Sequence, residues 1–187
     1  MYEILKGLTD LPICILSIIF MILIYRKNKK SKSFYAFLFL SIASLGGILL
    51  HCFKVTEPFL SICWVIECIL LMKVVLMFIF LILNKDIKKI FKILLIILII
   101  PIILSRIFLP RLDIYFVTVY SSILLIYMLY IMYKEKIKIK NQKKIIIVLI
   151  LTVISQIIKD LIPYGVVIGH ILILSILYFI YLVIKDR

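Results

Sequence analysis

Long apolar stretches alternate with short polar connections along the whole chain. Each stretch is close to the roughly 20 residues that an α-helix needs to cross a bilayer. The pattern predicts an all-α fold, a polytopic membrane bundle of seven transmembrane helices, and it makes residues 1–187 a single integral membrane domain. The predicted spans cover residues 8–25, 34–53, 60–83, 90–109, 113–133, 144–162 and 164–184.

Two prolines bear on the number of spans. Pro101 interrupts the fourth stretch, where it removes a backbone donor and is expected to kink the helix. Pro163 alone separates the sixth stretch from the seventh, so the turn between them has to be tight. A six-span alternative, in which residues 144–184 are partly re-entrant, stays open beside the seven-span prediction.

The basic residues divide unequally between the two sides that this arrangement creates. The first, third and fifth connections and the C-terminal tail hold most of them: Arg26, Lys27, Lys29, Lys30, Lys32, Lys85, Lys88, Lys89, Lys92, Lys134, Lys136, Lys138, Lys140, Lys143, Lys144, Lys185 and Arg187. The opposite side holds Lys6, Lys54, Arg106, Arg111 and Lys159. Because cytoplasmic loops are enriched in Lys and Arg, the sequence predicts a multi-pass protein of the cell membrane with its N-terminus outside and its C-terminus in the cytoplasm.

The composition agrees with a membrane protein and narrows its partners. The chain is 66% hydrophobic with a mean hydropathy of +1.28, whereas soluble domains are about half apolar. The net charge of +14 does not indicate nucleic-acid binding, because the basic residues are spread over connections rather than gathered on one folded face. No basic segment precedes the first apolar stretch, so we expect no cleavable signal peptide. The abundance of Ile and Lys suggests a bacterial genome rich in AT, and the expected partner is the lipid bilayer.

Four ionisable side chains lie inside the predicted spans. Each costs about 2.5–3.5 kcal/mol at mid-helix, which makes it a functional candidate. They are His51, Glu67, Lys73 and His170. At a rise of 1.5 Å per residue, the topology puts His51, Glu67 and His170 within roughly the outer 10 Å of the span. Asp10 and Asp160 are expected just above them, at the outer ends of the first and sixth spans.

Histidines and a carboxylate that converge in an apolar cavity suit more than one role. His51 and His170 are candidate ligands of Zn²⁺, which takes three protein ligands and a water in catalytic sites. With Glu67 they could equally form an acid–base pair. The third interpretation is structural: each histidine hydrogen-bonds separately to the backbone or to water near the interface.

Three further features are interpreted as structural. Lys73 is expected near the membrane midplane, either paired with a partner on another helix or extended toward water. Ser44 is expected to hydrogen-bond between helices, and Gly46-Gly47 to let two helices approach closely. The alternative for the glycine pair is that it leaves room beside His51.

Short motifs near both ends of the chain resemble a known group of proteins. Thr9-Asp10 opens the first span, Leu45-Gly46-Gly47-Ile48-Leu49-Leu50-His51 ends the second, and His170 precedes I-L-I-L-S-I-L-Y-F-I-Y in the last. The chain resembles a family of uncharacterised seven-span prokaryotic proteins. That family is similar in layout to the alkaline ceramidase and adiponectin-receptor-like superfamily of membrane hydrolases, in which a His of helix two and an H-x-x-x-H pair of helix seven hold zinc.

The resemblance implies that His51 and His170 are metal ligands, but the motif is incomplete. Leu174 stands four residues after His170, where the second late His is expected, and Gly47 stands where the superfamily has Ser. Glu67 or Asp160 would, by position, stand in for the missing polar groups as catalytic residues. A zinc site of three histidines is excluded, because the chain has two.

Two functions therefore follow from the sequence. The first is a reduced or inactive relative of metal-dependent hydrolases that cleave amide or ester bonds in lipids. The second is a non-enzymatic sensor or permease whose outer cavity, lined by His51, Glu67 and His170, holds a small-molecule ligand or a proton. The first predicts zinc in the purified protein, whereas the second predicts a ligand whose binding depends on Glu67.

Overall fold

The computed structural model is helical in the part of the chain that it describes. It describes residues 2–28, 31–53, 56, 58–83, 88–108, 119, 122–123, 126–127, 129–130, 142–162 and 164–185. The helices there are α1 (Tyr2–Lys27), α2 (Lys32–Cys52), α3 (Phe59–Leu83), α4 (Lys88–Phe108), α6 (Gln142–Leu161) and α7 (Gly165–Ile184). The prediction of an all-α bundle is confirmed for these residues.

The helices follow the predicted spans closely. Six of the seven spans correspond to a helix, and α1 begins well before the predicted start at residue 8. The remaining span, 113–133, lies largely outside the described residues. Pro101 lies inside α4, which continues on both sides of it. By length and apolar character α1, α2, α3 and α7 are each able to cross a membrane, which indicates an integral membrane protein.

Local sequence accounts for the helix ends that matter most for the packing. Ser31 caps α2, because its side chain accepts a hydrogen bond of 3.2 Å from the backbone N–H of Ser33. Lys27, in the last turn of α1, donates to the carbonyl oxygen of Lys185 at 2.9 Å. This bond ties the end of α1 to the end of α7.

The turn between α6 and α7 is tight, as Pro163 in the sequence predicts. The backbone N–H of Gly165 donates to the carbonyl oxygen of Ile162 at 2.8 Å, and Tyr164 between them has φ 61°. A residue with a Cβ adopts this left-handed conformation at a cost of order 1–3 kcal/mol. The turn therefore holds α7 directly antiparallel to α6 and fixes the height of the residues that α7 presents to its neighbours.

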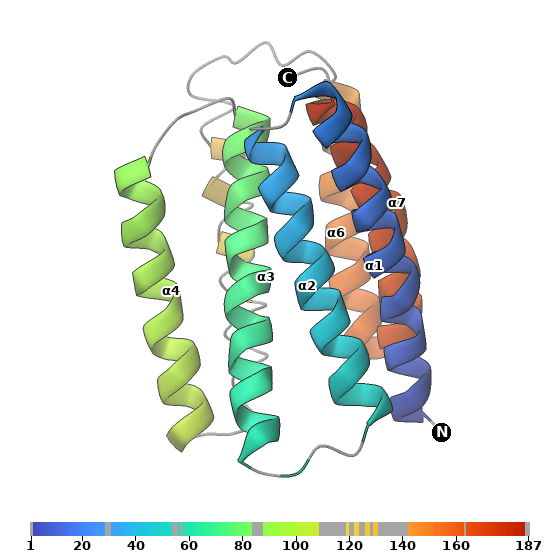
Figure 1. Ribbon diagram of the computed structural model, residues 1–187, viewed down its shortest axis with the longest axis vertical. Coiled ribbons are helices and arrows are strands. Elements are labelled where there is room, and N and C mark those ends of the chain that lie inside the picture. The colour runs from blue at the N-terminus through green and yellow to red at the C-terminus, as the bar shows by residue number, and fades with distance from the viewer. Residues whose placement is uncertain are drawn as a thin grey trace.

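Four helices close into one group. Helices that are adjacent in the chain pack together along the series α4, α3, α2 and α1, and α7 packs between α1 and α6 (Figure 1). Contacts between α3 and α7 then close α1, α2, α3 and α7 into a four-helix group, with α4 and α6 outside it. Among the described residues, these four are also the helices with the length and apolar character of membrane spans.

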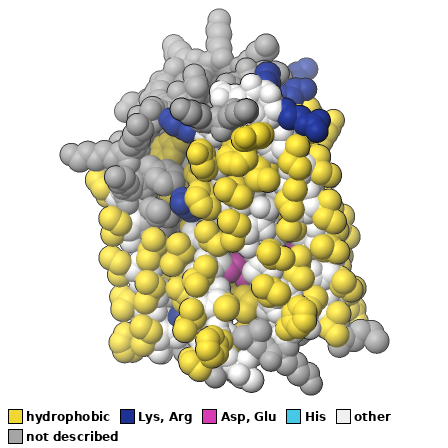
Figure 2. All heavy atoms as spheres, in the orientation of Figure 1, with side chains coloured by type: hydrophobic (Ala, Val, Ile, Leu, Met, Phe, Trp, Pro, Cys, Tyr) yellow, Lys and Arg dark blue, Asp and Glu magenta, His cyan; other side chains and the backbone are white. Residues whose placement is uncertain are grey.

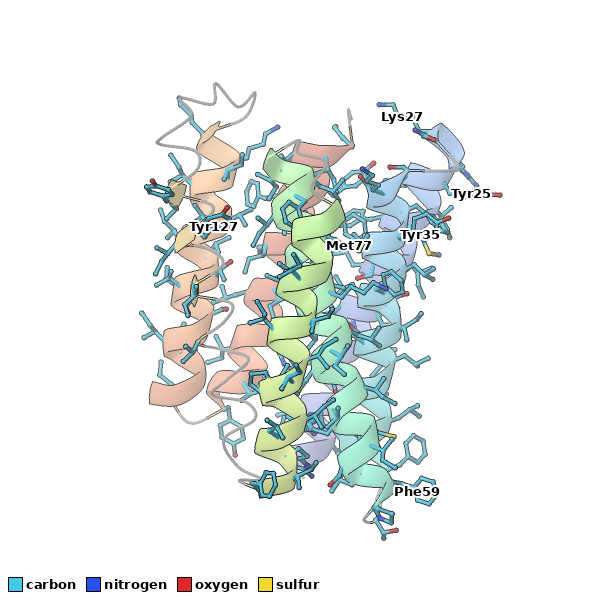
Figure 3. The ribbon with its side chains drawn as sticks, turned by 90° about the vertical axis from the view of Figure 1, so that its left-hand side faces the viewer. Tyr25, Lys27, Tyr35, Phe59, Met77 and Tyr127 are labelled. Atoms are coloured by element: carbon cyan, nitrogen blue, oxygen red, sulfur yellow. The ribbon has the colours of Figure 1, made fainter. Side chains whose placement is uncertain are left out.

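The two ends of the bundle differ in their side chains. The lower end, as drawn in Figure 1, holds the N-terminus, and Phe59 lies at this end in Figure 3. The upper end holds the C-terminus, with Tyr25, Lys27 and Tyr35 toward it (Figure 3). Figure 2 shows a lateral face covered by apolar side chains, with Lys and Arg gathered near the upper end. An apolar lateral face with basic side chains toward one end is typical of a membrane-spanning bundle.

Aromatic side chains from the four grouped helices meet in the upper half of the core. Phe20 stacks on Tyr181 with 4.3 Å between ring centroids and meets Phe37 edge-on at 5.4 Å. Phe37 in turn meets Phe78 edge-on at 5.2 Å. We call Phe20, Phe37, Phe78 and Tyr181 the aromatic layer. Each grouped helix contributes one ring, so the layer crosses the whole four-helix group.

Candidate functional site

Polar side chains from α1, α3 and α7 lie close together, next to α2, in the lower half of the four-helix group. They are the side chains of Thr9, Asp10, Glu67 and His170, which lie around Gly47. We call these four side chains the polar cluster. With Gly47, every helix of the group supplies part of it, so the cluster lies inside the group rather than at one helix pair.

Asp10 and His170 form the contact between α1 and α7. His170 Nδ1 lies 3.3 Å from Asp10 Oδ1, and each side chain is only 12% exposed. The same nitrogen lies 2.9 Å from the hydroxyl oxygen of Thr9. One ring nitrogen therefore meets two oxygens of α1.

The hydroxyl of Thr9 reveals which partner carries the proton. Thr9 Oγ1 donates its single hydrogen to the carbonyl oxygen of Lys6 at 2.7 Å. It can then only accept from His170, so we assign the hydrogen to His170 Nδ1. In a nucleophilic triad the hydroxyl and the carboxylate meet opposite nitrogens of the imidazole. Here both meet Nδ1, so the contact stabilises the helix pair and does not activate Thr9.

Gly47 makes room for both carboxyl groups. A Cβ at residue 47 would stand 2.6 Å from Asp10 Oδ2 and 3.1 Å from Glu67 Oε1. These two oxygens are therefore no farther apart than the sum of those distances. A Cβ at Gly46 would meet nothing within 4 Å. Of the two interpretations of the glycine pair, the close approach of neighbouring helices fits Gly47. The side chains that approach it are those of Asp10 and Glu67.

Glu67 is the member of the cluster with an unsatisfied oxygen. Its Oε2 is buried and has no hydrogen-bond partner among the described residues. Asp10 and Glu67 are also the two acidic residues whose side chains the structure describes, and both are in the cluster. Acidic atoms are visible near mid-height on the largely apolar face in Figure 2. A buried carboxylate oxygen without a donor costs about 1–3 kcal/mol or more, so this arrangement favours an added positive group.

His51 lies near the cluster but one helical turn away. Its Cβ is 3.1 Å from where a Cβ of Gly7 would stand, and Gly7 precedes Asp10 by three residues on α1. His51 likewise follows Gly47 by four residues on α2. Both relations put it toward the lower end, about 4.5 to 6 Å along the axis at 1.5 Å per residue. The structure thus brings Glu67 and His170 to one site, with His51 at its lower edge.

The residues of the polar cluster do not fit a zinc site. Within the described part of the chain, no three His, Cys, Asp or Glu side chains are grouped so that they could hold a metal ion. His170 is the one histidine of the cluster, whereas zinc in catalytic sites takes three protein ligands.

The other candidate residues lie elsewhere. Lys73 Nζ stands 3.5 Å from the ring centroid of Phe39, so its partner on another helix is an aromatic ring. Ser44 is buried at 6% exposure on α2, one turn above Gly47. Asp160 belongs to α6, and its side chain lies outside what the structure describes.

The central place of Asp10 is the main feature that the spans alone did not indicate. The predicted first span put Asp10 at the membrane border, but α1 extends to Tyr2 and carries Asp10 deeper into the bundle. The available signal was the pair of short motifs: Thr9-Asp10 and Gly46-Gly47 both supply residues to the cluster.

Comparison with known proteins places the whole bundle in one family. A family model described as a family of unknown function (DUF6962) matches residues 5–187. The match includes every residue of the polar cluster and of the aromatic layer. No curated protein and no solved structure matches the chain.

Proposed function

Since the chain belongs to DUF6962, a family whose function is unknown, we propose its function from the polar cluster: it is an integral membrane protein that binds a small, singly charged cation. The proposal covers a proton and a small monovalent ion, because both supply one positive charge. Binding leaves the ligand chemically unchanged, so the protein is not an enzyme in this account.

The buried Oε2 of Glu67 carries the proposal. Glu67 Oε1 and Asp10 Oδ2 face the same space beside Gly47, and Oε2 has no donor among the described residues. Two carboxylates so close together inside a membrane repel each other and lose their hydration. A cation between them offsets both costs, which is the reason to expect one there.

The basic side chains near the carboxyl pair lie at different heights in the bundle. Lys73, six residues beyond Glu67 on α3, stands over the ring of Phe39. Lys6 and His51 lie one turn from Asp10 and Gly47, on the side of the lower end. His170 directs its Nδ1–H to Oδ1 of Asp10, on the other side of that carboxyl from Oδ2.

Thermal unfolding of the purified protein tests the proposal. At equal ionic strength, Na⁺, K⁺, Li⁺ or NH₄⁺ is compared with choline, a much larger monovalent cation. One of them should raise the Tm of the wild type, since a ligand at 100 times its Kd stabilises the folded state by about 2.7 kcal/mol. If the ligand is a proton, the salts are equivalent and the Tm rises as the pH falls.

Matched variants locate the effect. Glu67→Gln and Asp10→Asn should abolish the stabilisation, whereas Asp186→Asn, which removes the same charge next to the C-terminus, should keep it. A wild type that responds neither to the small cations nor to pH, or a Glu67→Gln variant that responds like the wild type, contradicts the proposal.

We further propose the complete topology of seven spans with the N-terminus outside and the C-terminus in the cytoplasm. Loop charges support it, as do the Lys and Arg side chains near the upper end (Figure 2). On this topology the polar cluster lies in the outer half of the membrane. An N-terminal epitope that antibodies reach in intact cells agrees with it, and one that they reach only after permeabilisation contradicts it.

A second candidate is a membrane hydrolase related to alkaline ceramidases. It is favoured by one observation, that Thr9, Asp10 and His170 of the resembling motifs lie together beside Gly47. The donor set, however, does not suit zinc. Stoichiometric zinc in the purified protein that is lost on His170→Ala would favour the hydrolase over the cation-binding proposal.

A further inference from the structure

The aromatic layer and the polar cluster are built by the same four helices at matching heights. Phe20 follows Asp10 by ten residues on α1, and Phe37 precedes Gly47 by ten on α2. Phe78 follows Glu67, and Tyr181 follows His170, by eleven. At 1.5 Å per residue all four intervals are about 15 Å. The four-helix group therefore carries two parallel layers, one polar and one aromatic.

Side chains between and beyond these layers differ in polarity. Small polar groups lie between them on α1 and α2: Cys14, Ser17, Ser41 and Ser44, all buried. The thiol of Cys14 donates to the carbonyl oxygen of Ser41 at 3.5 Å, so this strip joins α1 to α2. Above the aromatic layer, the described buried side chains of the four helices are apolar apart from Ser33, at the start of α2.

The aromatic layer is closely packed across the group. Phe20, Phe37 and Phe78 are exposed by 5%, 0% and 6%, and their contacts with one another and with Tyr181 run without a break from α7 to α3. A hydrophobic constriction of this kind excludes water, and ions do not pass where water is excluded.

We propose that the aromatic layer closes the bundle between the polar cluster and the upper end, so that the cation reaches and leaves Glu67 without crossing the layer. The protein is then a receptor for the cation and not a permease. This inference rests on the proposed function, because it concerns the route to the proposed ligand.

Proton flux into proteoliposomes tests the seal. The protein is reconstituted into liposomes that contain a pH-sensitive dye, and a potassium diffusion potential drives protons inward. The wild type should be as tight as empty liposomes. Phe20→Ala combined with Phe37→Ala should raise the flux about tenfold or more, which corresponds to lowering the barrier by about 1.4 kcal/mol or more. Adding Glu67→Gln to this double variant should lower the flux again, because the route passes the cluster.

A matched control removes two rings from the same helices away from the layer. Tyr25 and Phe34 lie 5.6 Å apart near the upper end, and Tyr25→Ala with Phe34→Ala should leave the liposomes tight. If Phe20→Ala with Phe37→Ala does not give monodisperse protein, Phe20→Leu with Phe37→Leu decides the matter with a smaller change in volume.

The outcomes separate this inference from the proposed function. Proton flux through the wild type above that of empty liposomes overturns the proposed seal. So do folded Phe20 and Phe37 variants that leave the liposomes tight, and a Tyr25 and Phe34 control that leaks as much as the Phe20 and Phe37 variants. Suppose that small cations or low pH raise the Tm of the wild type but not of Glu67→Gln, and that the flux measurements give one of these contradicting results. The proposal of a seal then fails, and the proposal of a cation site is kept. If that stabilisation is absent, the proposed function itself fails.

Discussion

His170 Nδ1 lies 3.3 Å from Asp10 Oδ1, so α7 near the C-terminus is joined to α1 near the N-terminus inside the bundle. Thr9 strengthens the junction by accepting from the same nitrogen. The junction holds two walls of the polar cluster together, and the cluster depends on it for its shape.

The junction predicts a difference between two substitutions of His170. Asn places an N–H close to the position of Nδ1–H, so His170→Asn should keep most of the stability. His170→Ala leaves Asp10 without this donor and should lower the free energy of unfolding by about 1–2 kcal/mol. Thermal unfolding in detergent measures both. Equal losses in the two variants would show that the Nδ1 contacts do not stabilise the fold.

The two adjacent glycines supply a matched pair of variants. At Gly47 an added methyl group would stand 2.6 Å from Asp10 Oδ2, so Gly47→Ala forces α1, α2 or both carboxyls to move. We expect a loss of about 1–3 kcal/mol and a loss of cation-dependent stabilisation. Gly46→Ala meets nothing within 4 Å and should be neutral or stabilise by up to about 1 kcal/mol. A Gly47→Ala protein as stable and responsive as Gly46→Ala contradicts the packing described here.

Lys73 and Phe39 should be energetically coupled. The ammonium group stands 3.5 Å from the ring centroid in the span, where a cation–π contact is worth about 0.5–2 kcal/mol. A double-mutant cycle with Lys73→Met and Phe39→Leu, read by thermal unfolding, should return a coupling energy in this range. Additive effects of the two substitutions would mean that Lys73 is stabilised by water or headgroups instead.

The sequence was sufficient to predict where most of the helices lie along the chain. It was not sufficient to predict which face of each helix turns toward the inside of the bundle. Six of the predicted apolar stretches are helices, and four of these have the length and apolar character to cross a bilayer. Spans that are apolar all round, such as α3, do not reveal which face turns inward. The inward faces of α1 and α2 are set by close contacts, such as Gly7 against Cys52 and Gly47 against Asp10.

Because the sequence does not reveal the inward faces of the helices, the site could be predicted only by height along the helices. Counting residues from the span ends put His51, Glu67 and His170 at one depth, and in the structure Glu67 and His170 both lie near Asp10. Residue counting did not show that Asp10, rather than His51, is the neighbour of Glu67 and His170. Asp10 and His51 differ in height by only about one helical turn, and α1 begins before the apolar stretch from which the count starts. The role of Asp160 stays a prediction.

Chemical labelling of Glu67 tests the cation site most directly. Dicyclohexylcarbodiimide is apolar and adds to protonated carboxyl groups within membranes, and mass spectrometry of the digested protein locates the adduct. We predict that Glu67 is labelled, and that the small cation which raises the Tm, or a higher pH if the ligand is a proton, slows the reaction while choline does not. Labelling that leaves Glu67 unmodified, or a rate at Glu67 that neither small cations nor pH change, would contradict a cation site between Asp10 and Glu67.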